Sequence, residues 1–230
     1  MFSTNYEKRK DIKIAMKKIL RGILNKIRRL RIGNCSDAQD DVSIFCNCCI
    51  GGAMYHDLRK RFMSPTINLY FAHHHFIDFV LNLKDYLENG HLLDSGRKEP
   101  TNNAPIGLLK CQGLPTLEIH FLHYHSFEDA YDKWFSRCKR VNYQKIFLVI
   151  EAKDTHEHEL LNEYVNLPYN KIIFTNLESD SSKNIMHMNF YDRFKKPITS
   201  YTSIFAKKGY DQFDFKKAIF YRDNWEYRNS

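Results

Sequence analysis

The sequence predicts an α/β fold, a three-layer α/β/α arrangement in which a mainly parallel, Rossmann-like sheet carries an inserted β-hairpin. Short apolar runs alternate with stretches of helical periodicity, which is typical of parallel strands joined by helices. The runs that we interpret as strands of the parallel sheet are residues 42–46, 67–71, 146–150 and 172–175. The run IFLVI at 146–150 has no polar residue, which favours a strand buried on both faces.

Helical periodicity fills intervals between these strands and predicts helices at residues 53–62, 73–87 and 157–165. A further helix is expected to begin after Ser126 and to extend to about residue 140. Ser126 and Asp129 have the spacing of an N-terminal cap, in which a hydroxyl accepts a hydrogen bond from a free backbone N–H. The alternation of strand and helix therefore continues beyond the middle of the chain.

The inserted hairpin is predicted from two runs of strand-forming residues, 106–111 and 116–123, on either side of Gly113. The preceding stretch, residues 93–104, is rich in Gly, Pro and Asn, and we expect it to be a loop. Both features would lie between the second and third predicted strands of the parallel sheet.

The N-terminal segment carries most of the positive charge of the chain. Residues 8–31 hold eleven Lys and Arg residues against Asp11 alone, a net charge of +10, whereas the whole 230-residue chain carries +8 and the remainder therefore −2. An apolar stripe with helical spacing runs through the same segment: Ile12, Met16, Ile19, Ile23, Ile27 and Leu30. We expect an arm at 1–33, a linker at 34–41 and one α/β domain at 42–230.

This basic amphipathic arm has three interpretations. It can lie on an anionic membrane through residues 8–31, pack against the domain with its basic face in solvent, or bind RNA. The near-neutral domain argues against a broad nucleic-acid-binding face. No apolar run reaches the ~20 residues of a membrane span, and no secretory signal is visible. We therefore expect a cytoplasmic protein, peripheral to the inner face of the plasma membrane.

The loop after the first predicted strand is the main candidate for a functional site. It contains Asn47, Cys49 and two glycines, Gly51 and Gly52, which we interpret as a tight turn that exposes a helix N-terminus to an anionic ligand. Cys49 there is either a nucleophile with a lowered pKa or a small residue that fits a crowded turn. The cysteines lack the second Cys pair of a structural zinc site, so no metal or cofactor is predicted.

Other residues could contribute to such a site. His123 is the candidate for proton transfer, and His125 would share its face if the strand continued. Arg137 and Arg140 lie three positions apart on one helix and could bind a diphosphate or form ordinary salt bridges. Glu151 and Asp154 follow a buried strand and are candidate carboxylates, whereas we expect the histidines at 73–75 on the surface.

The same loop also carries a resemblance to a known family. Asn47, Cys49, Gly51, Gly52 and Tyr55, with Ser-Pro-Thr at 64–66, resemble the Asn-Asn-Cys-Trp-Gly-Gly signature of a bacterial family of unknown function, whose members are commonly labelled exopolysaccharide biosynthesis proteins. The resemblance extends over roughly residues 42–220, with Cys48 and Ile50 replacing the usual Asn and Trp. It implies an α/β fold and a role in surface polysaccharide synthesis.

Together these observations favour a transferase that uses a phosphate-bearing sugar or acyl donor. Asn47, Cys49, Gly51 and Gly52 would shape the donor site, with His123 as the proton-transfer group. The predicted ligand-binding set is completed by Ser64, Thr66, Arg137 and Arg140. The alternatives are a non-catalytic, membrane-docked partner of polysaccharide enzymes, favoured by the absence of a transferase motif, and a hydrolase that uses Cys49 and His123.

Overall fold

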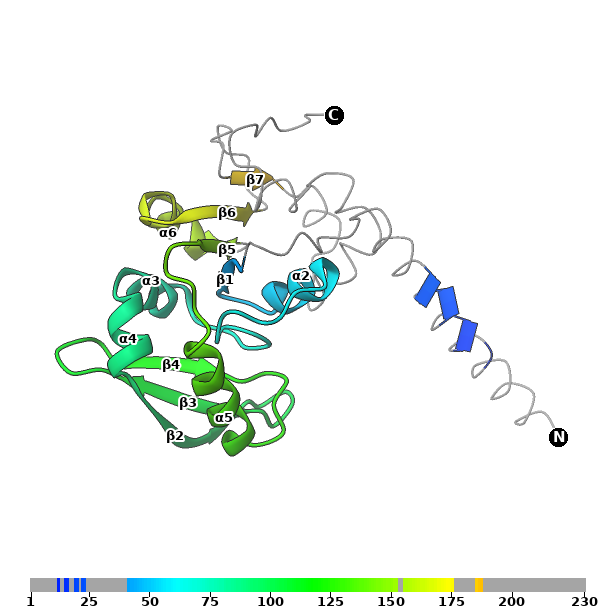
Figure 1. Cartoon of the computed structure of the whole chain (residues 1–230), viewed down its shortest axis with the longest axis horizontal. Coiled ribbons are helices and arrows are strands. Elements are labelled where there is room, and N and C mark those ends of the chain that lie inside the picture. Colours follow the sequence, from blue (N-terminus) through cyan, green and yellow to red (C-terminus); the bar gives the residue numbers. More distant parts are fainter. Residues whose placement is uncertain are drawn as a thin grey trace.

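The computed structural model describes residues 12, 15, 16, 19, 20, 22, 23, 41–152, 155–175 and 185–187. These residues form a mixed α/β structure with two separate sheets, one parallel and one antiparallel (Figure 1). The linker residues 34–40 and the carboxylate candidate Asp154 lie outside the described residues.

The parallel sheet has the strand order β1-β5-β6-β7. Its strands are β1 (Ser43–Cys46), β5 (Ile146–Ala152), β6 (Asn170–Thr175) and the short β7 (Ile185–His187). Every residue of β5 is buried, because the strand lies inside the sheet between β1 and β6. The predictions of strands at 42–46, 146–150 and 172–175 are confirmed.

The antiparallel sheet consists of β2 (His91–Lys98), β3 (Pro105–Lys110) and β4 (Leu117–His120), in that order. The β3–β4 hairpin was predicted, but the loop predicted at 93–104 was wrong because β2 occupies much of it. Most side chains of β2 are exposed, and its pairing with β3 shifts register between Asp94 and Lys98, so its sequence shows no alternation of apolar and polar residues.

The prediction of a strand at residues 67–71, here called the bridging segment, was wrong. The segment forms one isolated antiparallel bridge, between Tyr70 and His120, and Asn68 has a φ of 61°, which interrupts extended backbone. Its apolar side chains are nevertheless fully buried. The Phe71 N–H donates to the carbonyl of Asn47, which follows β1. The bridging segment therefore connects the ends of the two sheets.

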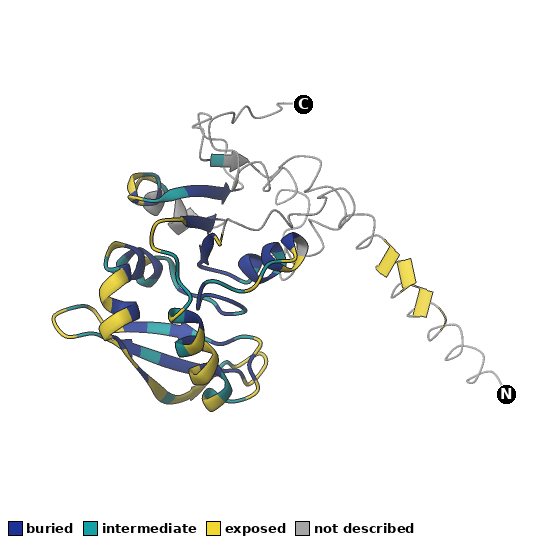
Figure 2. Cartoon of the chain, viewed as in Figure 1, coloured by how far each residue is buried: buried dark blue, intermediate teal, exposed yellow. Residues whose placement is uncertain are grey.

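The helices pack around these sheets and differ in part from expectation. The first, α2 (Ile50–Leu58), begins three residues earlier than predicted. The predicted helix at 73–87 is two helices, α3 (His73–Leu81) and α4 (Leu83–Asn89), because the backbone of Asn82 between them is not helical. The buried residues of α3 are Phe76, Ile77, Phe79 and Val80, and Figure 2 shows the strand β5 in the dark blue of buried residues.

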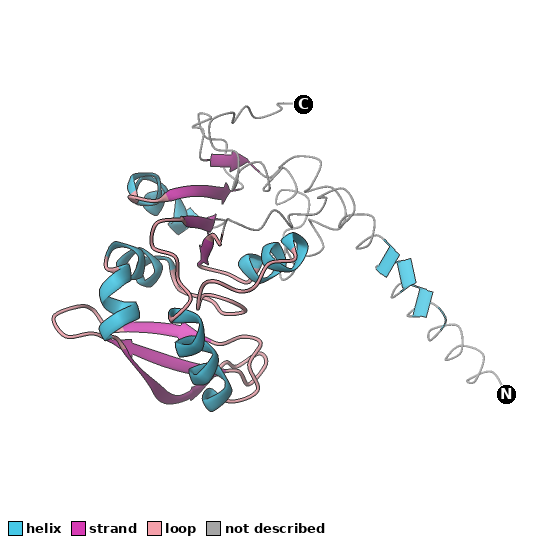
Figure 3. Ribbon diagram, viewed as in Figure 1, coloured by secondary structure: helices cyan, strands magenta, loops and turns pink. Residues whose placement is uncertain are grey.

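The last two helices agree with the sequence pattern. The first of them, α5 (Phe127–Cys138), is capped as predicted, because the Ser126 hydroxyl accepts a hydrogen bond from the Asp129 N–H. The helix α6 (Thr155–Asn166) joins β5 to β6. Figure 3 shows the described turns of the N-terminal arm as helix, and their large apolar side chains are exposed.

Candidate functional site

Asn47 joins the ends of two strands of the parallel sheet. Its side chain is 1% exposed. Its Oδ1 accepts a hydrogen bond from the Glu151 N–H at 3.0 Å, and its Nδ2 donates to the Glu151 carbonyl at 3.0 Å. The carboxamide thus continues the pairing of β1 with β5 beyond the last residue of β1. Both polar atoms of Asn47 are engaged with the backbone, so its geometry is that of a structural clamp.

The clamp extends to two residues that the sequence analysis missed, His73 and Tyr164. The Nδ1 atom of His73 lies 3.4 Å from Asn47 Nδ2 and also contacts the Tyr164 hydroxyl. The prediction of surface positions for 73–75 was therefore wrong for His73, and also for His75, whose Nδ1 accepts from the Glu118 N–H at 3.2 Å. His73 and Tyr164 are 91 positions apart in the sequence, so no local sequence pattern could predict their contact.

Cys49 is not activated by its place at the start of α2. Burial, and then the nearby charge of Glu151, raise the pKa of its thiol from 9.0 to about 12. The pKa values of Cys46 and Cys48 are raised for the same main reason, burial. The lowered pKa expected at a helix N-terminus is therefore absent, and Cys49 is a neutral thiol near pH 7. Its Sγ lies 3.7 Å from the Leu69 carbonyl.

The two glycines have a packing role rather than the predicted role in an exposed turn. Both are buried and lie in the first turn of α2 itself. A Cβ on Gly51 would lie 2.6 Å from Cys46 Sγ, and one on Gly52 would lie 2.8 Å from Asn68 Oδ1. The glycines thus let α2 approach β1 and the bridging segment closely. A larger side chain at Gly51 would therefore have to displace Cys46 Sγ.

Several predicted residues gather around the bridging segment. Three successive carbonyls of this segment accept hydrogen bonds: Ile67 from the Tyr124 hydroxyl at 2.7 Å, Asn68 from the His123 N–H at 3.3 Å, and Leu69 from the Cys49 thiol. Cys49 and His123 therefore hydrogen-bond to neighbouring carbonyls of the same segment, those of Leu69 and Asn68.

Their roles in this arrangement differ. His123 is held through its backbone, and its side chain is exposed. The expected continuation of the strand to His125 is absent, because β4 ends at His120.

Ser64 and Thr66 cover the outer edge of β1. Thr66 Oγ1 accepts from the Cys46 N–H at 3.0 Å and is hydrogen-bonded to the Ser64 hydroxyl at 2.9 Å. Two residues along β1, the Tyr55 hydroxyl accepts from the Ile44 N–H at 2.8 Å and donates to the Val42 carbonyl at 2.9 Å. These hydroxyls satisfy the edge of the sheet, so Ser64 and Thr66 are committed to the fold.

Arg137 and Arg140 form a separate cluster with aromatic side chains. Arg137 is 7% exposed, its Nη1 donates to the Tyr124 hydroxyl at 2.6 Å, and its guanidinium lies 5.1 Å from the centre of the Phe62 ring. Arg140 donates to the Phe62 carbonyl at 3.1 Å and to the Ser136 hydroxyl at 3.1 Å. This part of the predicted set contains cationic groups without a compensating carboxylate among the described residues.

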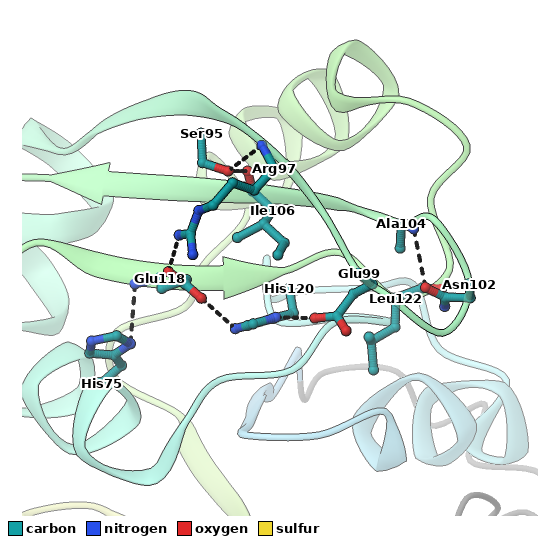
Figure 4. Close-up of polar contacts among 10 residues, drawn as sticks. All are labelled: His75, Ser95, Arg97, Glu99, Asn102, Ala104, Ile106, Glu118, His120 and Leu122. Carbon is teal, nitrogen blue, oxygen red and sulfur yellow. Dashed lines mark hydrogen bonds and ion pairs between the residues drawn. The ribbon is translucent and has the colours of Figure 1, made fainter.

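A polar network on the antiparallel sheet was not predicted (Figure 4). Glu118 accepts from Arg97 and lies 3.1 Å from His120 Nε2, while His120 Nδ1 contacts Glu99. Burial opposes ionisation of Glu118, but Arg97 and His120 hold its pKa below the usual range. Because both ring nitrogens of His120 face carboxylates, the network fastens the tip of the β2–β3 hairpin to β4.

The described residues contain neither a cluster of metal-binding side chains nor a helix that could span a membrane. No group of three or more His, Cys, Asp or Glu side chains in this part of the chain could hold a metal ion. No helix within it combines the length and the apolar character needed to cross a bilayer.

Comparison with known proteins shows that a family model matches most of the chain. Residues 15–219 match the family described as "Domain of unknown function (DUF1919)". The chain is also similar to an uncharacterized protein of Haemophilus influenzae, with 28% identity over 209 residues, which cover 90% of this chain and 95% of the relative. The family match begins inside the predicted arm and extends through the parallel sheet.

Proposed function

Because the chain belongs to the DUF1919 family, whose function is unknown, we propose a function from its own geometry. The protein is a peripheral membrane transferase of bacterial surface polysaccharide synthesis, with exopolysaccharide, capsule or lipopolysaccharide as the product. It works at the cytoplasmic face of the membrane and uses a phosphate-bearing sugar or acyl donor. We also propose that the helices around the parallel sheet form a three-layer, Rossmann-like arrangement with it.

The observation that carries the proposal is the exposed apolar stripe of the N-terminal arm. Its large side chains have exposed fractions between 51% and 64%. They are Ile12, Met16, Ile19, Leu20 and Ile23. Such a stripe on a helix calls for a partner, and the net charge of +10 over residues 8–31 complements an anionic lipid surface. Each Lys or Arg near such a surface contributes about 1 kcal/mol, so the segment has enough charge for reversible binding.

The transferase part of the proposal is supported by two weaker observations. The loop after β1 resembles the signature of proteins labelled for exopolysaccharide biosynthesis. Arg137 of α5 and Arg140, just beyond the end of this helix, are suited to a phosphate group on the donor. The acceptor would be presented at the membrane to which the arm holds the protein.

A second candidate function is a non-catalytic partner that positions other enzymes at the membrane. It is favoured by the loop after β1, where the Asn47 carboxamide is occupied by backbone groups and the pKa of the Cys49 thiol is raised to about 12. The same observations weigh against the third possibility, a hydrolase with Cys49 as its nucleophile. Among the described contacts, Cys49 bonds to the Leu69 carbonyl and the His123 N–H to the Asn68 carbonyl, and none joins the Cys49 thiol to the His123 ring.

Sedimentation with lipid vesicles tests the membrane part. The full chain should sediment with vesicles containing phosphatidylglycerol, and binding should weaken as salt rises. The double variant Ile19→Glu/Ile23→Glu should lose binding, because both side chains lie in the exposed stripe. The matched control is Leu81→Glu on α3, which removes an equally exposed apolar side chain outside the arm. Equal sedimentation of the double variant and the wild type would contradict the proposal.

A thermal-shift assay with nucleotide sugars and acyl-coenzyme A donors tests the transferase part, because a ligand that binds the native state raises the apparent unfolding temperature. A donor that stabilises the protein and is turned over in the presence of vesicles would support the enzyme. Vesicle binding without a response to any donor would favour the non-catalytic partner.

A further inference from the structure

Arg137, on α5, is a buried arginine that has no ionic partner among the described residues, and it lies beside Phe62 in the loop that follows α2. Arg137 is 7% exposed, yet none of the ion pairs among the described residues includes it. Its described contacts are the Tyr124 hydroxyl and the rings of Phe62 and Tyr124. A guanidinium has five N–H donors, and this arrangement uses one of them for a hydrogen bond. A buried charge of this kind is costly unless another group compensates it.

The neighbouring residues increase the positive charge instead of reducing it. Arg140 follows Arg137 by three residues, just beyond the end of α5, and Arg61 directly precedes Phe62, whose carbonyl accepts from Arg140. Burial, followed by the charges of Arg61 and Arg137, lowers the pKa of Arg140, and no carboxylate acts in the opposite direction. The nearby Asp129 is paired with Lys133 at 2.7 Å. The charges of Arg61 and Arg137 therefore both act against that of Arg140.

The surroundings hold these groups in place. The Tyr124 hydroxyl accepts from Arg137 and donates to the Ile67 carbonyl, so both of its hydrogen-bonding roles are used. The Phe62 carbonyl accepts from Arg140, while the Phe62 ring lies beside Arg137. Arg137 and Arg140 are thus held by the fold before any ligand binds, which lowers the entropic cost of binding.

We propose that Arg61, Arg137 and Arg140 bind the phosphate or diphosphate group of a phosphate ester. Guanidinium groups present paired N–H donors that match phosphate oxygens, and an anion would supply the charge that the cluster lacks. That this phosphate belongs to the transferred donor rests on the proposed function. The anion site itself rests on the arginine geometry and is independent of the membrane arm.

Titration of the full chain with sodium pyrophosphate and with a nucleotide sugar, without membranes, tests the site. We expect both ligands to bind by calorimetry and to raise the unfolding temperature, with an affinity that falls as salt rises. Arg61→Gln changes an exposed side chain and should weaken both affinities about tenfold, the loss expected for one charge-assisted contact. Arg137→Met should abolish both.

The matched control is Lys139→Gln, an exposed cation at the end of the same helix, which should bind both ligands as the wild type does. If Arg137→Met fails to fold, Arg61→Gln decides alone. The proposal is overturned if neither ligand binds the wild type, or if Arg61→Gln binds both as tightly as the wild type.

A third titration, with vesicles that contain phosphatidic acid, distinguishes a soluble ester from a lipid headgroup. An effect of Arg61→Gln confined to these vesicles would overturn the assignment to a donor. Pyrophosphate binding by a protein that ignores phosphatidylglycerol vesicles would contradict the membrane proposal and leave the anion site supported.

Discussion

Replacement of Asn47 should reveal how much of the fold depends on one carboxamide. In Asn47→Ala, the N–H and the carbonyl of Glu151 both lose their described partner, in a position where the original side chain is 1% exposed. Each buried polar group left without a hydrogen bond costs about 1–3 kcal/mol. The free energy of unfolding should therefore fall by about 2–6 kcal/mol. Urea unfolding followed by circular dichroism measures this change.

The chain provides a matched control for this substitution. Asn102 makes the same two kinds of bond, from its Nδ2 to the Leu122 carbonyl at 2.8 Å and from the Ala104 N–H to its Oδ1 at 3.1 Å, but it is exposed (Figure 4). The bond to the Leu122 carbonyl is exposed and water can replace it, so Asn102→Ala should cost less than Asn47→Ala. Equal losses for the two variants would refute the reasoning, because burial would then not set the cost.

Two further predictions concern the same loop. Gly51→Ala should destabilise the protein by about 1–3 kcal/mol, because the new Cβ would lie 2.6 Å from Cys46 Sγ. The double variant Gly51→Ala/Cys46→Ala lacks this sulfur, so a double-mutant cycle should show coupling between the two sites. Purely additive changes in the free energy of unfolding would contradict the contact. For Cys49, the folded state keeps a proton that an unfolded thiol releases near pH 9.0, so stability should fall as pH rises from 9.0 to about 12. Cys49→Ala should reduce this fall in urea midpoints measured across that range, and an unchanged pH dependence would show that the thiol is not buried as described.

The parallel sheet could be predicted because its strands carry their own signal. The run IFLVI at 146–150 is apolar throughout, and burial of both faces is the condition that permits such a run. The strand β2 carries no such signal, because its mostly exposed residues do not alternate between apolar and polar. Its position is set instead by its pairing with β3. The bridging segment has a strand-like composition, but Asn68 turns its backbone away from continued pairing.

The candidate site shows the same division between local and distant causes. The sequence predicted that Asn47, Cys49 and His123 would lie near one another, and the structure brings all three to the bridging segment. The sequence could not predict that the backbone of Glu151, 104 positions away, would bind the Asn47 carboxamide. Nor could it predict that burial would raise the pKa of Cys49. A helix N-terminus favours a thiolate, but loss of solvent acts in the opposite direction and is larger here.

The hydroxyls along β1 also determine how copies of this protein can meet. The N–H groups of Ile44 and Cys46, which a further strand would need for pairing, are already bonded to Tyr55 and Thr66. A second chain could not add a strand at these positions without breaking both bonds and exposing Tyr55, a side chain with no solvent exposure. The protein thereby avoids intermolecular sheet extension, a common route to aggregation, at one margin of its most apolar layer. Tyr55→Phe would remove part of this protection while preserving the shape of the side chain.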